Sequence, residues 1–147
     1  MNKLKSLIIW CTGALIYGLI EIVYRGYTHW TMILLAFAVS ILLDAYNERI
    51  GWDWSFIKQI LVGGTIITIA EFIVGCIVNL WLGMNVWDYT NVPLNILGQI
   101  CPQFWMAWCG LTMIAIPIFD WERYFIYRIS IKLGLDCESE MKPVYFH

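Results

Sequence analysis

Long apolar stretches separated by short polar segments dominate the pattern of this chain. There are four of them, over about residues 7–24, 30–46, 56–82 and 96–119. A bilayer core about 30 Å thick needs roughly 20 apolar residues in helical form, and these stretches lack the period-2 alternation of β-barrel strands. The pattern therefore predicts an all-α fold in one domain: a membrane bundle of four transmembrane helices, followed by a tail over residues 120–147.

The composition agrees with this pattern. Of the 147 residues, 61% are hydrophobic and 14% are charged, whereas soluble domains carry about 25% charged residues. The chain is also rich in Trp and Tyr, which gather at membrane interfaces. A net charge of −2 with no basic stripe gives no sign of nucleic-acid binding, so the expected surroundings are the lipid bilayer and other membrane subunits.

The placement of basic residues predicts the orientation of the helices. With four spans, the N-terminus, the second connection and the tail lie on one side, and the first and third connections lie on the other. Only Arg25 falls on the second side, while the first side holds the other basic residues, which are Lys3, Lys5, Arg49, Lys58, Arg123, Arg128, Lys132 and Lys142. Because cytoplasmic segments carry the excess of Lys and Arg, we expect both termini in the cytoplasm and a multi-pass protein of the cell membrane.

Glu21 is the first of two carboxylates at membrane depth, where an ionisable group costs at least about 2.5 kcal/mol at a helix centre. Tyr17 precedes it by four residues and Arg25 follows it by four, so the three side chains share one helix face. One interpretation is an intrahelical pair that neutralises Glu21 and anchors Arg25 at the headgroups. The other is a polar site that faces the bundle. The sequence leaves both open.

Glu71 is the second carboxylate, near the middle of the third stretch. It belongs to a stripe at spacings of three and four, made of Gly64, Thr68, Glu71, Gly75 and Asn79. Small residues let helices approach closely and polar ones hydrogen-bond across the contact. The stripe therefore indicates either tight packing, with Glu71 protonated or hydrogen-bonded to a neighbouring helix, or a role linked to a proton, an ion or a solute.

The fourth stretch shows a comparable face. Gln99, Gln103, Ala107 and Gly110 recur at helical spacing, and Pro102 lies among them. Because proline lacks a backbone donor, we expect Pro102 to kink the outer turn of this helix and to free carbonyl groups there. Such a kink either lines a cavity, as in transporters with broken helices, or has no function.

These polar features fall mainly in the outer half of the predicted bundle. We therefore predict a polar pocket, open to the outside and lined by the first, third and fourth helices. Its candidate solute-binding residues are Glu21, Arg25, His29, Glu71, Asp88, Asn95, Gln99 and Gln103. The prediction requires that Glu21 and Glu71 do not face lipid or opposite sides of the bundle.

Signatures of catalysis, metals and cofactors are absent from the sequence. The two histidines, His29 and His147, form no HxxxH or Glu-x-x-His pattern. No serine lies in GxSxG, and no GxxxxGK[ST] phosphate loop occurs. We therefore expect no metal, no cofactor and no enzyme activity in this chain, and any ATP hydrolysis to take place on a separate subunit.

Two stretches resemble a known family. The first is Tyr17 to Met32, with the run Tyr24-Arg25-Gly26-Tyr27-Thr28-His29-Trp30 within it. The second comprises Trp87-Asp88-Tyr89, Pro93-Leu94-Asn95, Gly98-Gln99-Ile100-Cys101 and Phe104-Trp105. Together they resemble the type IV ABC-transporter membrane family, which is called CmpB-like. The resemblance implies a bacterial membrane component of a transport system, with matched polar positions at Glu21, Arg25, His29, Asp88, Asn95 and Gln99. Because the chain is short, it also implies partners: a second copy, another membrane subunit or a separate ATPase.

Three functions are compatible with the sequence. The first is a transport component that binds a solute or an ion from the outer side. The second is a structural or regulatory subunit that contacts another membrane protein through its Gly-rich faces. The third is a membrane enzyme that acts on a lipid-linked substrate, with Glu21 and His29 as acid–base groups.

Overall fold

The computed structural model describes residues 3–49 and 54–134 of the chain, and this part is all-helical, without a β-strand. The helices are α1 (Lys3–Arg25), α2 (Trp30–Arg49), α3 (Phe56–Gly75), the π-helical segment η1 (Cys76–Trp81) and α4 (Pro102–Lys132). Four helical spans, with η1 counted as the end of α3, are long and apolar enough to cross a membrane. The predicted fold class and helix number are thus confirmed. Lys142 and the rest of the predicted tail beyond Gly134 lie outside the described residues.

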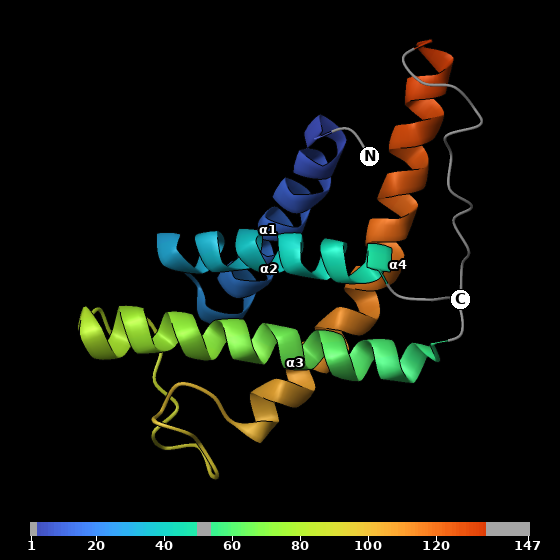
Figure 1. Ribbon diagram of the computed structural model, residues 1–147. Coiled ribbons are helices and arrows are strands. Elements are labelled where there is room, and N and C mark those ends of the chain that lie inside the picture. Colours follow the sequence, from blue (N-terminus) through green and yellow to red (C-terminus); the bar gives the residue numbers. More distant parts are fainter. Residues whose placement is uncertain (1–2, 50–53, 135–147) are drawn as a thin grey trace.

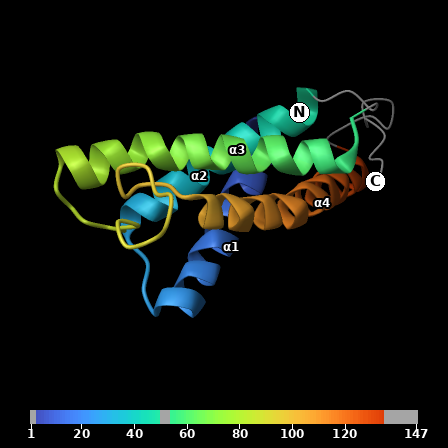
Figure 2. The ribbon, with the colours of Figure 1, turned by 90° about the horizontal axis from the view of Figure 1, so that it is seen from below.

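The helices are arranged as two pairs (Figure 1). α1 packs mainly on α2, and α4 packs mainly on α3. α2 and α3 run side by side in opposite directions, and α1 and α4 cross them obliquely, which the view from below also shows (Figure 2). α1 and α4 contact each other only sparsely. α2 and α4 contact each other even less, so α4 is held mainly by α3.

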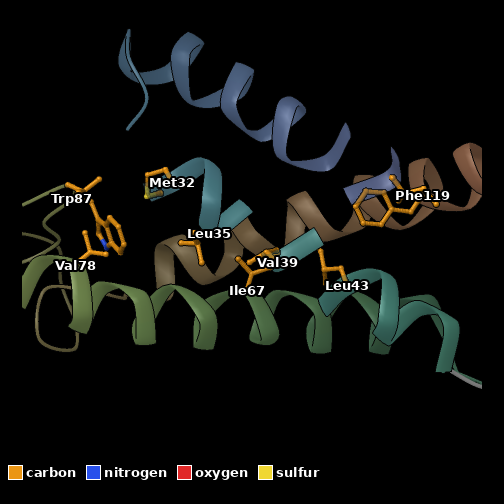
Figure 3. Close-up of a cluster of buried hydrophobic side chains, with 10 residues drawn as sticks. Met32, Leu35, Val39, Leu43, Ile67, Val78, Trp87 and Phe119 are labelled. Carbon is orange, nitrogen blue, oxygen red and sulfur yellow. The ribbon is translucent and has the colours of Figure 1, made fainter. Parts of the chain in front are cut away.

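The core follows the line where α2 faces α3 and α4 (Figure 3). Its buried side chains include Met32, Leu35, Val39 and Leu43 of α2, at the three- and four-residue spacing of one helix face. Glycines bring α3 close to α4: a Cβ at Gly64 would lie 2.9 Å from the backbone nitrogen of Cys109. The small-residue stripe of α3 is thus used for packing within the chain.

Local chemistry sets the ends of α1 and α3. α1 ends at Arg25, and the next residue, Gly26, has a φ of +80°, the left-handed conformation that glycine adopts without strain. α3 begins after Ser55, whose hydroxyl accepts the Lys58 backbone N–H at 3.4 Å. The backbone widens into a π-helix from Cys76 onward, so the predicted helix over 56–82 is continuous in space but not in its hydrogen-bond register.

The fourth helix begins later than the sequence predicts. The prediction is a helix over 96–119 that is kinked at Pro102, whereas α4 begins at Pro102 itself. Proline is well suited to the first helical position, because its missing N–H would have no partner there. Pro102 therefore starts the helix instead of kinking it, and Gln99 does not share a helix face with Gln103.

The fourth helix also ends later, at Lys132, so residues 120–132 continue α4 and are not part of a separate tail. Contacts with α1 and α2 hold this extension. Arg123 pairs with Asp44, and the Lys5 ammonium lies 4.7 Å from the centre of the Tyr127 ring. The sequence does not show this extension clearly because charged and aromatic residues break the apolar pattern after Phe119.

Candidate functional site

The loop over residues 82–101, which connects η1 to α4, folds back over one end of the bundle, where α1 ends and α3 finishes (Figures 1 and 2). Asn79 organises its first half: the amide donates to the Trp87 carbonyl at 3.1 Å and to Gln99 Oε1 at 2.8 Å, and it accepts the Val86 N–H at 2.7 Å. The Trp87 indole donates to the Gln99 carbonyl at 3.1 Å. These bonds satisfy polar groups that are buried together, so the loop has a defined structure.

Asn95 organises the second half of the loop. Its amide donates to the carbonyls of Thr90 and Val92, at 3.1 and 2.8 Å, and accepts the Gly98 N–H at 2.9 Å. Gly98 has φ +67°, and a Cβ there would meet Thr90 at 2.7 Å. Asn95 and Gln99 are therefore explained by the architecture of the loop, which is a structural role.

Glu21 and Arg25 fasten α1 to this loop. Arg25 Nη1 donates to Glu21 Oε1 at 2.8 Å, and Arg25 Nη2 donates to the Val86 carbonyl at 2.7 Å. The Thr28 hydroxyl donates to the other oxygen of Glu21. Glu21 is buried, but its charge is matched by Arg25. Of the two interpretations of Glu21, the structure contains the intrahelical pair and adds a tertiary contact to it.

Glu71, unlike Glu21, is held by hydrogen bonds from neutral side chains. Its side chain is 1% exposed. Tyr89 Oη donates to Oε1 at 3.0 Å, and Trp108 Nε1 donates to Oε2 at 2.7 Å. Both donors are neutral, and the ion pairs among the described residues involve other acids, namely Glu21, Asp44, Glu48 and Asp120. Glu71 is thus a buried carboxyl group with hydrogen bonds but without a cation.

Aromatic rings surround the Glu71 carboxyl group. The Tyr89 ring stacks on Phe104 with 4.3 Å between centroids, and Phe104 lies 6.1 Å from Trp108. Tyr17 of α1 lies 6.2 Å from Trp108 on the other side. Burial and the neighbouring Glu71 carboxylate raise the pKa of Tyr89 above its usual value, so its phenol stays protonated and donates.

A cavity of about 100 Å³ lies beside Glu71, between the four helices. Its lining is mainly apolar, and Glu71, Tyr17, Ser40 and the Trp108 indole supply its polar groups. The predicted pocket differs in two ways. α2 contributes to it as well as α1, α3 and α4, and its walls are apolar where the sequence suggests a polar vestibule.

Of the eight predicted site residues, Glu71 alone lines this cavity. Asp88 and Gln103 are exposed. The Asp88 carboxylate accepts a hydrogen bond from the Thr90 backbone N–H at 2.8 Å, and this bond lowers the pKa of Asp88. His29 hydrogen-bonds Thr31 at 2.7 Å, at the start of α2. Glu21 and Glu71 therefore do not converge in one pocket, although both are tied to the 82–101 loop.

The sequence pattern did not predict Tyr89 and Trp108 as partners of Glu71. Trp108 carries a signal that could have been used: it lies well inside the fourth apolar stretch, away from the interfaces where Trp is common. A buried indole N–H needs an acceptor, and Glu71 is an acceptor at a similar depth. For Tyr89 the sequence offers no comparable signal, since its contact depends on how the loop folds back.

The helices and the buried polar groups define the class: a multi-pass, all-α membrane protein with a loop closing one end of its bundle. A family model described as "Putative ABC-transporter type IV" matches residues 4–134, and the chain belongs to this family. The family associates the chain with the membrane and with other transporter subunits. No curated protein and no solved structure matches the chain.

Proposed function

We propose that this protein is a membrane-embedded transport component that binds its solute in the cavity beside Glu71. The observation that carries the proposal is a buried carboxyl group on the wall of a cavity, with no cationic partner among the residues that the structure describes. Ionisable groups inside a membrane are costly and are commonly retained for function. Packing alone would be served more cheaply by a neutral hydrogen-bonding residue at position 71.

The alternative roles receive less support from the geometry. Gly64, which belongs to the small-residue stripe suggested as a contact face, packs against Cys109 within the chain, and its neighbour Gly63 packs against Thr112. The acid–base pair that an enzyme would need is also not assembled, because Glu21 bonds Arg25 and Thr28 while His29 bonds Thr31. We therefore propose a transport role and no catalysis in this chain, and a separate ATPase subunit or a second copy as its partner.

The proposal includes an orientation in the cytoplasmic membrane, with both termini inside and the 82–101 loop outside. The positive-inside bias of the sequence supports it, as does Arg25, whose position at the loop end matches the single basic residue expected there. The test is a fusion of the C-terminus to a phosphatase that is active only outside the cytoplasm. We expect this fused phosphatase to be inactive. An active fusion would contradict the orientation.

The function is tested in a strain that lacks the gene for this chain. The strain is complemented with the wild type, Glu71→Gln or Glu48→Gln, and small molecules in cells and medium are compared by mass spectrometry. Glu48 is a matched control because it is an exposed acid at the opposite end of the bundle. We expect Glu71→Gln to behave like the deletion and Glu48→Gln like the wild type, at equal protein levels. A Glu71→Gln strain with the wild-type profile would overturn the proposal.

A further inference from the structure

The acids buried in the bundle differ in how their charge is balanced. Asp44 pairs with Arg123 and accepts the Trp10 indole N–H at 2.9 Å, and Glu21 pairs with Arg25. Within residues 3–49 and 54–134, Glu71 accepts only from Tyr89 and Trp108. A carboxylate offers about four lone-pair positions, so two of those of Glu71 remain for a ligand. A buried negative charge without a counter-charge favours a cationic ligand.

The cavity walls indicate what kind of cation fits. An inorganic cation such as Ca²⁺ or Mg²⁺ requires six or more oxygen ligands, from protein or water, whereas the cavity lining beside Glu71 is mainly aliphatic and aromatic. The described residues also contain no cluster of His, Cys, Asp or Glu suited to a metal ion. Tyr17 and Trp108 line the cavity next to the carboxyl group, and the π-systems of such rings attract organic cations, above all alkylammonium groups.

The size and the opening of the cavity further restrict the kinds of cation that it can bind. A volume of about 100 Å³ is somewhat smaller than the roughly 150 Å³ cavity that admits benzene, so the cavity accommodates one small group rather than a large drug-like molecule. Ile20 of α1 and Ile114 of α4 line it and are also 48% and 56% exposed. The cavity therefore opens sideways between these two helices, where a bilayer would supply hydrocarbon.

From this geometry we propose that the cavity binds the ammonium head group of a small organic monocation, an alkylammonium or arylalkylammonium ion that enters from the bilayer between α1 and α4 and keeps its apolar substituent in the opening. The ammonium group lies against Glu71, Tyr17 and Trp108, and its apolar substituent lies between Ile20 and Ile114. This inference rests on the proposed function, because it names the class of solute for the same cavity.

The test is equilibrium binding of radiolabelled benzyltrimethylammonium to the full-length protein in lipid nanodiscs. Its uncharged carbon analogue, 2,2-dimethylpropylbenzene, has nearly the same shape and serves as a competitor. We expect saturable binding that falls at least about tenfold in Glu71→Gln, a difference of about 1.4 kcal/mol. Binding is expected to stay within twofold of the wild type in Glu48→Gln and in the presence of the neutral analogue.

A second variant keeps the test decisive if Glu71→Gln does not fold. Ala115 lines the cavity and is not one of the donors to Glu71, which are Tyr89 and Trp108, so Ala115→Phe fills the space while leaving the carboxyl group and its donors in place. We expect it to abolish binding, with helical content and elution volume unchanged. Unaltered binding in Ala115→Phe or Glu71→Gln, or equal competition by the neutral analogue, would overturn the inference.

The two proposals fail in different ways. If the wild type binds no benzyltrimethylammonium while Glu71→Gln still resembles the deletion strain, the solute class is wrong and the transport function stands. If Glu71→Gln complements the deletion fully, the proposed function is wrong, whatever the binding experiment shows.

Discussion

Glu21 and Glu71 are both buried carboxyl groups in apolar helices, yet their surroundings differ. Glu21 lies one turn from Arg25, and the pair joins α1 to the 82–101 loop through the Val86 carbonyl. Glu71 lies between two neutral donors on the wall of a cavity. The first arrangement neutralises a charge and fixes two segments together. The second leaves a buried carboxyl group hydrogen-bonded to neutral donors beside a cavity. Burial of an acid alone therefore does not separate an ion pair that joins two segments from a candidate site, and the partners of the acid are needed to tell them apart.

Asp44 is a third buried acid, at the opposite end of the bundle, and it is paired with Arg123. We expect removal of this pair to cause the largest loss of stability. Arg123→Ala leaves the Asp44 carboxylate buried with only the Trp10 indole as partner. Removing one member of a buried pair costs about 3–5 kcal/mol. We expect a loss of unfolding free energy near that range, measured by denaturant titration in mixed micelles. Arg128→Ala, on the exposed part of the same helix, serves as the control and should change stability by less than about 0.5 kcal/mol. A small effect of Arg123→Ala would mean that Asp44 is not structurally paired.

Glu21→Gln is expected to have the next largest effect. It removes the charge that Arg25 pairs with, and hydrogen bonds to charged groups contribute about 1.5–3 kcal/mol. We expect a loss in the lower part of this range, since Arg25 is partly exposed. Thermal unfolding in detergent measures it, and the double variant Glu21→Gln/Arg25→Gln should recover part of the loss. No recovery would show that Arg25 acts mainly through Val86.

The Gly64→Ala variant tests the close packing of α3 on α4, which places Trp108 against Glu71. Its new methyl group would lie 2.9 Å from the Cys109 backbone nitrogen and 3.0 Å from its Cα, so α3 and α4 must separate. Overpacking of this kind costs about 1–3 kcal/mol. Gly110→Ala is the matched control, because a Cβ there meets no atom within 4 Å. We expect Gly110→Ala to be neutral or slightly stabilising in the same unfolding assay, and equal losses in both variants would contradict the close approach.

Glu71→Gln is expected to have the smallest effect on stability, within about 1 kcal/mol of the wild type or slightly stabilising. No cation loses its partner, the amide oxygen still accepts from Trp108, and the Tyr89 hydroxyl can accept from the new amide N–H₂. The same replacement at two buried glutamates should thus destabilise one and spare the other. A loss larger than that of Glu21→Gln, in the same thermal unfolding measurement, would break the comparison and assign Glu71 a structural role.

The sequence by itself determined the class of the fold. Apolar stretches of bilayer length give four spanning helices, because a bilayer leaves the backbone no other partners for its N–H and C=O groups. Helical spacing likewise placed Glu21 beside Arg25 and placed Glu71 on a face with Gly64 and Asn79, because such pairs are local. These contacts depend on three or four residues of separation and require no knowledge of the other helices.

Only the tertiary structure decided which of these polar residues belong to a site. Glu71 meets Tyr89 and Trp108, which are 18 and 37 residues away, and the cavity beside it forms only where all four helices meet. The start of α4 at Pro102 places Gln99 in the loop, and α4 continues to Lys132, with Arg123 in this extension paired to Asp44. Helix periodicity describes one helix at a time, whereas a counter-charge, a donor or a cavity depends on neighbours that the folded chain brings in from far along the sequence.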